Sequence, residues 1–193
     1  MRILVLSFLC AASLTVVAQS ENKEVITRIA FGSCNNQDKP QDIWYKIAAQ
    51  QPQLFIFLGD NIYGDTRNME VLQDKYNQLA AKPGYIELQK KTPVIATWDD
   101  HDYGINDGGK EYPFKEESKK IFLKFFHEPD SSERWKHKGI YTSYIYGVDG
   151  KKLQIIMLDL RTFRDKLVRV RADLDCKGPY IKMKNKRKTF LGK

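Results

Sequence analysis

The sequence predicts an α/β fold built on parallel strands. Short apolar runs end abruptly at turn residues, amphipathic helical stretches separate them, and an Asp-Gly turn joins two strand-like runs late in the chain. The runs cover residues 26–31, 54–58, 92–98 and 153–158. A chain of 193 residues that is 42% hydrophobic is about one domain and can build a core.

The first two runs predict a strand-helix-strand unit. Asp38 is placed to cap a helix that begins near Pro40, carries an apolar face and ends by Pro52. Such a unit places the strands at 26–31 and 54–58 side by side and parallel, joined by a right-handed crossover.

The stretch up to the third run predicts two helices. Residues 69–81 carry an apolar stripe at helical spacing, Lys82-Pro83-Gly84 breaks the pattern, and residues 85–90 form a short helical piece. The third strand follows at 92–98.

The later part of the domain predicts a loop, a helix and a hairpin. Residues 103–113 are rich in Gly, Asn and Asp, and residues 114–126 show a helical period. Asp149-Gly150 lies between strand-like residues 139–147 and 151–158, which is typical of a β-hairpin.

Chemically active side chains follow the apolar runs. The four ends carry Cys34, then Asp60, then Asp99-Asp100-His101, then Asp159. Ligands collect at the carboxyl edge of open α/β sheets, so we expect these groups to converge. Two like charges about 4 Å apart repel by about 4 kcal/mol at an effective dielectric near 20, so the cluster needs cations or protons.

The residue types suit metal-assisted hydrolysis at phosphorus. Carboxylate and amide oxygens favour hard cations, whereas the Cys34 thiolate and the Tyr63 phenolate favour ferric iron or another transition metal. In such a reaction metal ions hold the phosphoryl oxygens, His101 protonates the leaving alkoxide, and Arg161 binds phosphate with its planar fork.

Each assignment has a structural alternative. Asp60 could cap a helix, His101 could bridge loops, and Tyr63 could be a packing residue. Arg161 could instead pair with Asp159 or Asp165. Cys34 could form a disulfide with Cys176, because an exported protein with two remaining cysteines can pair them.

The two ends of the chain have their own signatures. Residues 1–18 carry one Arg and a long apolar run, which predicts a Sec-type signal peptide and a secreted or periplasmic protein, with a lipid anchor on Cys10 as a weaker alternative. Residues 166–193 hold ten of the 32 basic residues, which predicts a solvated, partly disordered tail. No specific nucleic-acid partner and no transmembrane segment are expected, and the oligomeric state is left open.

Four motifs together resemble a known family. FGSCNNQ (31–37), FLGDNIYGDT (57–66), ATWDDHDYG (96–104) and LDLRTFRD (158–165) are similar, in order and spacing, to the PhoD-like alkaline phosphatase D proteins of the metallophosphatase superfamily. The resemblance covers residues 25–165. It implies a four-layer β-sheet sandwich flanked by helices, and hydrolysis of phosphomonoesters or phosphodiesters with iron and calcium or another divalent metal.

The resemblance also implies residue roles. Cys34, Asp60 and Tyr63 match the iron-binding set, and Asp100 takes a metal-binding place. His101 would be the leaving-group acid, with Arg161 and Asn35 binding substrate.

One departure affects the expected activity. Family members continue to a late Gly-Asp-x-His motif, whereas no histidine follows His137 here. The chain therefore resembles an incomplete N-terminal portion. The alternatives are a phospholipase D-type phosphodiesterase and a catalytically incomplete fragment that binds phosphate or metal.

Overall fold

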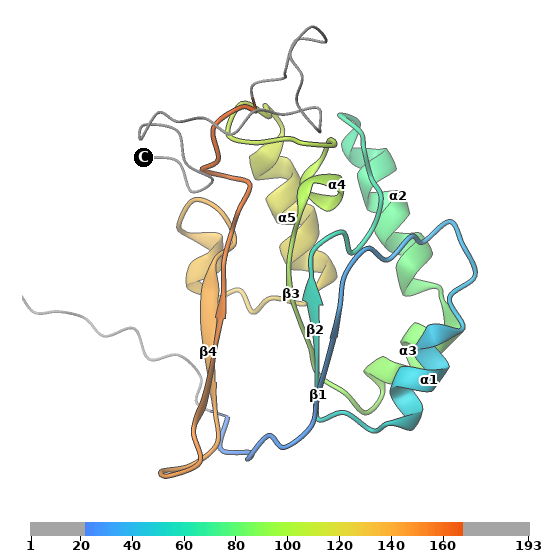
Figure 1. Cartoon of the computed structure of the whole chain (residues 1–193). Coiled ribbons are helices and arrows are strands. Elements are labelled where there is room, and N and C mark those ends of the chain that lie inside the picture. The colour runs from blue at the N-terminus through green and yellow to red at the C-terminus, as the bar shows by residue number, and fades with distance from the viewer. Residues whose placement is uncertain (1–21, 168–193) are drawn as a thin grey trace, which may run out of the picture.

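The first three apolar runs form one parallel sheet in the computed structural model, which describes residues 22–167 (Figure 1). The strands are β1 (Ile29–Gly32), β2 (Leu54–Leu58) and β3 (Val94–Thr97), in the order β1-β2-β3. Ile29 pairs with Leu54, and Phe55 pairs with Val94. The predicted parallel pairing of the first two runs is confirmed.

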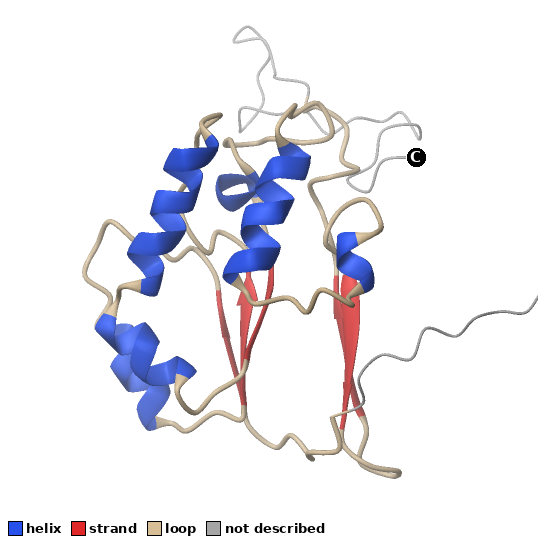
Figure 2. Ribbon diagram, turned by 180° about the vertical axis from the view of Figure 1, so that it is seen from behind, coloured by secondary structure: helices blue, strands red, loops and turns tan. Residues whose placement is uncertain are grey.

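Helices cover one face of this sheet (Figure 2). Phe55, Phe57 and Ala96 are buried on that face and belong to the main core with Trp44 and Phe122. The core is rich in edge-to-face aromatic pairs, such as Trp44 with Phe55 at 5.3 Å between ring centroids. The helical elements are α1 (Ile43–Ala49), α2 (Met69–Ala80), α3 (Pro83–Gln89), α4 (Asp100–Tyr103), α5 (Lys115–Phe125) and the 3₁₀ turn η1 (Glu133–Trp135).

The predicted hairpin is confirmed as an antiparallel ribbon of β4 (Thr142–Tyr146) and β5 (Leu153–Met157). Tyr146 and Met157 of the ribbon pack with Leu54, Ile56 and Ile95 in a second cluster, on the sheet face away from the helices. The fourth apolar run therefore does not join the parallel sheet, because its hydrogen bonds go to β4. The α/β class is confirmed, and the four-layer sandwich stays a prediction.

Two helix starts differ from expectation. Asp38 caps no helix and instead binds Lys75, whose Nζ lies 2.9 Å from Asp38 Oδ1, while α1 begins later with Asp42 at its cap position. The predicted break between the two helices is present, but α3 begins at Pro83 rather than at residue 85, since the fixed φ of proline and its missing N–H suit the first helical position.

Several expectations lie outside the described residues. These are the signal peptide at 1–18, Cys10, Cys176 and nearly all of the basic tail at 166–193. Within residues 22–167, no helix is long and apolar enough to cross a membrane.

Candidate active site

The loops that follow β1, β2 and β3 lie against one another at the carboxyl edge of the sheet. The Cys34 amide donates to the Gly59 carbonyl at 3.2 Å, and the Asn35 amide donates to the Asp60 carbonyl at 2.7 Å. Cys34 and Asp60 both adopt a positive φ, at 56° and 50°, which is uncommon for residues other than glycine and typical of functional loops. A Cβ at Gly59 would lie 2.7 Å from the Asp99 Cβ, so only glycine allows this approach.

The Asp102 side chain links the loop after β2 to the loop after β3. Its buried carboxylate accepts the Asp99 amide at 2.7 Å and the Asn61 amide at 3.1 Å. Burial raises the pKa of Asp102 well above its ordinary value, and the backbone hydrogen bonds partly oppose this. Asp102 was assigned no role from the sequence, although the Asp99-x-x-Asp102 spacing is a capping-box signal that could have revealed one.

Replacing Asp102 with alanine is expected to lower the free energy of unfolding by about 2–4 kcal/mol, because the buried Asn61 amide and the half-buried Asp99 amide lose their acceptor. Urea unfolding with chelator present measures this change. The control is Asp74→Ala on the exposed side of α2, expected to stay within about 0.5 kcal/mol of wild type. Equal stability of the two variants would contradict the scaffold role of Asp102.

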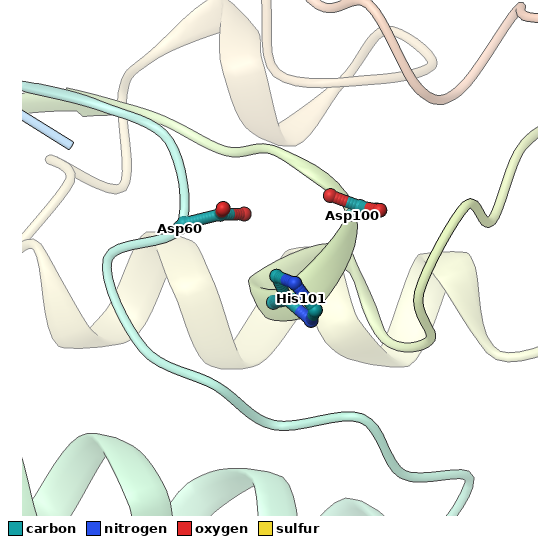
Figure 3. Close-up of side chains that lie close together, drawn as sticks. All are labelled: Asp60, Asp100 and His101. Atoms are coloured by element: carbon teal, nitrogen blue, oxygen red, sulfur yellow. The ribbon is translucent and has the colours of Figure 1, made fainter. Parts of the chain in front are cut away.

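Asp60, Asp100 and His101 form a cluster that can hold a metal ion (Figure 3). One ligand atom from each residue lies within 4.8 Å of the others. Asp60 Oδ1 is buried and has no hydrogen-bond partner, which is costly unless a cation or proton satisfies it. Burial raises the pKa of Asp60 and the charges of Asp99 and Asp100 add to this, whereas His101 and a hydrogen bond from Cys34 oppose it.

Cys34 and Tyr63 lie at the edge of this cluster. Cys34 is a free, exposed thiol whose Sγ lies 3.6 Å from Asp60 Oδ2. The Tyr63 ring packs on the His101 ring with 4.3 Å between centroids, so Tyr63 also has the packing role considered above. Burial, with Cys34 and Asp60 nearby, raises the pKa of Tyr63 to about 12. The donor set of carboxylates, imidazole, thiol and phenol fits a transition metal together with a hard cation.

Asp65 orients the His101 ring. His101 Nδ1 lies 2.7 Å from Asp65 Oδ2, which leaves Nε2 as the ring nitrogen available to a substrate. Burial alone would lower the pKa of His101, but the hydrogen bond and charge of Asp65, with the charges of Asp60 and Asp100, raise it overall. The largest cause that raises the pKa, the hydrogen bond with Asp65, comes from a residue 36 positions away in sequence.

This pair predicts a pH-dependent difference in stability. Because the folded-state pKa of His101 is raised, the stabilisation is fully present below the ordinary histidine value and is lost as pH rises through the folded-state pKa. In metal-free protein, the stability advantage of wild type over Asp65→Asn is expected to be largest near about pH 5.5 and to be lost as pH rises through the folded-state pKa of His101. Urea unfolding of both proteins across this range measures it. An advantage that grows with pH would refute the pairing.

Arg161 reaches the cluster through two aspartates that were not considered as its partners. Its Nε donates to Asp99 Oδ1, and its Nη2 lies 3.3 Å from Asp100 Oδ1. The expected alternatives are wrong, because its guanidinium forms an ion pair with neither Asp159 nor Asp165, and Asp165 instead pairs with Lys110.

Asp159 does not join the cluster, which corrects the expectation that all four strand ends converge. Its buried carboxylate accepts the amides of Ile140, Arg161 and Thr162, each at 2.9 Å, and the Thr162 hydroxyl at 2.7 Å. These four bonds saturate both oxygens, so Asp159 stabilises the turn that carries Arg161.

Asn35 also ties loops together. Its Nδ2 donates to the Asn61 carbonyl at 3.0 Å, and its part in substrate binding stays a prediction. A hollow of about 490 Å³ opens beside Cys34, Asn35 and Tyr63.

The family model described as PhoD-like phosphatase matches residues 29–193. A solved structure titled "Structure of PhoD" is similar with a TM-score of 0.59 and 18% identity, over 75% of this chain and 33% of that chain. The present chain thus spans about one third of that protein, and at this identity the likeness supports the fold alone. A search of curated proteins gave no match.

Proposed function

Since this chain belongs to the PhoD-like phosphatase family, we propose that it hydrolyses phosphate esters at the cluster of Asp60, Asp100 and His101. The observation that carries the proposal is the buried, unpartnered Oδ1 of Asp60, a residue whose carboxylate belongs to a group of possible metal-ligating atoms with Asp100 and His101. That arrangement is unfavourable for a purely structural carboxylate, and it lies where parallel sheets place their ligands.

Two kinds of metal position are proposed. Cys34, Tyr63 and Asp60 would hold iron through thiolate, phenolate and carboxylate, and Asp100 with Asp60 would hold calcium or another hard divalent ion. When bound, the ions would neutralise charge on the phosphoryl oxygens and supply a hydroxide nucleophile. Asp60 would contribute to both positions. Two contacts support this: Cys34 Sγ lies 3.6 Å from Oδ2, and Oδ1 has no hydrogen-bond partner.

His101 is proposed as the general acid that protonates the leaving oxygen. Asp65 keeps a proton on Nδ1 and favours the charged ring, so Nε2 can donate its proton to the leaving alkoxide. Tyr63 packs against one face of the ring and limits its rotation. The carboxylate and the ring contact together orient the acid before substrate binds.

Arg161 and Asn35 are proposed to bind the phosphate group. Nε and Nη2 of Arg161 contact Asp99 and Asp100, and no described residue bonds to Nη1. A guanidinium at this place can bind two phosphate oxygens as charge develops on them. Asn35 lines the same hollow as Cys34, and its Nδ2 donates to the Asn61 carbonyl.

The proposed substrates are phosphate monoesters and diesters. Monoesters and diesters share this chemistry, and a phospholipase D-type phosphodiesterase activity is the alternative within it. Since the chain covers 33% of the PhoD chain, a phosphate- or metal-binding protein without turnover is the second candidate. We also propose a secreted or periplasmic location and the four-layer sandwich fold.

The test is metal analysis of purified protein together with hydrolysis of 4-nitrophenyl phosphate and bis(4-nitrophenyl) phosphate. Hydrolysis that stops on chelation and returns with iron or calcium supports the proposal, and the ratio of the two rates separates monoesterase from diesterase. Bound phosphate without product supports the binding protein instead. Metal-free protein that still hydrolyses ester would overturn the metal-dependent mechanism.

A further inference from the structure

Arg161 forms ion pairs with both Asp99 and Asp100, and little of its side chain is exposed to solvent. Its side chain is 14% exposed, and that of Asp100 is 10% exposed. Nε contacts Asp99, while Nη2 faces Asp100 Oδ1 at 3.3 Å. Ion pairs screened from water in this way interact more strongly than exposed ones.

The two oxygens of Asp100 have different partners. Its Oδ2 accepts the Asp107 amide at 2.6 Å, which makes Oδ1 the oxygen better able to accept a cation. Arg161 already lies against Oδ1, and a guanidinium and a metal ion at the same oxygen repel each other. The two cations therefore compete for Asp100.

Asp99 differs from Asp100 in this respect. It lies outside the group of metal-ligating atoms formed by Asp60, Asp100 and His101, and its Oδ1 binds Arg161 Nε. A modest rotation about the Cδ–Nε bond of Arg161 would carry Nη2 away from Asp100 and leave the Nε atom beside Asp99. Asp99 is thus a positioning residue for the guanidinium.

We propose that Arg161 is an internal counter-ion which a metal ion displaces from Asp100, and which then binds the phosphate of the substrate while Asp99 retains it. This inference rests on the proposed function. Metal binding and phosphate binding then strengthen each other by the same factor, as linkage requires. Before a metal ion binds, the positive charge of Arg161 partly neutralises the acidic cluster.

Calorimetric titration with Ca²⁺ alone tests the competition. Arg161→Gln is expected to bind Ca²⁺ about tenfold more tightly than wild type. Arg161→Lys keeps the charge but cannot bridge both carboxylates, and it should bind Ca²⁺ a fewfold more tightly. Arg164→Gln is the control, since it removes a nearby buried charge that contacts the Asp107 and Gly108 carbonyls, and it should stay within about twofold of wild type.

Titration with inorganic phosphate tests the second half. Ca²⁺ should strengthen phosphate binding to wild type by at least about tenfold, and this gain should shrink in Arg161→Gln and in Asp99→Asn. Arg161→Gln with unchanged or weaker Ca²⁺ affinity would overturn the inference, as would wild type that binds no Ca²⁺. Both titrations measure binding without turnover, so an inactive chain can support the inference and an active chain can refute it.

Discussion

Asp60→Asn is expected to abolish metal binding while stabilising the metal-free fold. Removing a residue that only supports a metal ligand typically costs about 10- to 100-fold in metal affinity, so losing a central ligand should cost more than about 100-fold, with hydrolysis falling at least as far. In the absence of metal the change removes a buried negative charge whose pKa is raised by burial and by Asp99 and Asp100. The two effects therefore have opposite signs.

Thermal unfolding with and without Ca²⁺ measures both effects at once. The Tm of wild type should rise with Ca²⁺, whereas the Tm of Asp60→Asn should be higher than that of wild type in chelator and indifferent to Ca²⁺. Asp74→Asn on α2 is the matched control and should behave as wild type does. If Ca²⁺ raised the Tm of Asp60→Asn by as much as it raises the Tm of wild type, Asp60 would not be a metal ligand.

His101→Gln is expected to lower kcat by about 10²- to 10⁴-fold on an alkyl phosphate, which is the usual contribution of a general acid. The loss should be much smaller on 4-nitrophenyl phosphate, because its leaving group needs little protonation. His127→Gln, an exposed residue after α5, is the control and should leave both rates unchanged.

The dependence on leaving group distinguishes a catalytic role of His101 from a structural one. A variant that merely distorts the site would lose the same factor on both substrates. Equal losses would therefore assign His101 to loop packing or metal ligation.

The parallel sheet and its loops were predictable because their signals are local. An apolar run that ends at Gly59-Asp60 predicts both a buried strand and its exposed end, and the same logic located Cys34 and His101. The strand-helix-strand order then implied parallel pairing, which the observed register confirms. The hairpin followed from Asp149-Gly150 in the same way.

The partners within the site were not predictable, because they come from distant parts of the chain. Asp65 binds His101 and Asp99 binds Arg161 across separations of 36 and 62 residues, and no periodicity encodes such pairs. Asp159 was misassigned because a strand-end aspartate looks the same in sequence whether its oxygens are free or already bonded to nearby amides. Local patterns therefore located the acids but not which of them are available to a metal.

The most direct test of the account is an anomalous-scattering map of crystals grown with iron or calcium. The account predicts a peak at coordination distance, about 2.0–2.6 Å, from Asp60 Oδ1, with Asp100 close enough to ligate the same or a neighbouring ion. A peak elsewhere, with Asp60 Oδ1 still unpartnered, would contradict the assignment of this cluster as the metal centre.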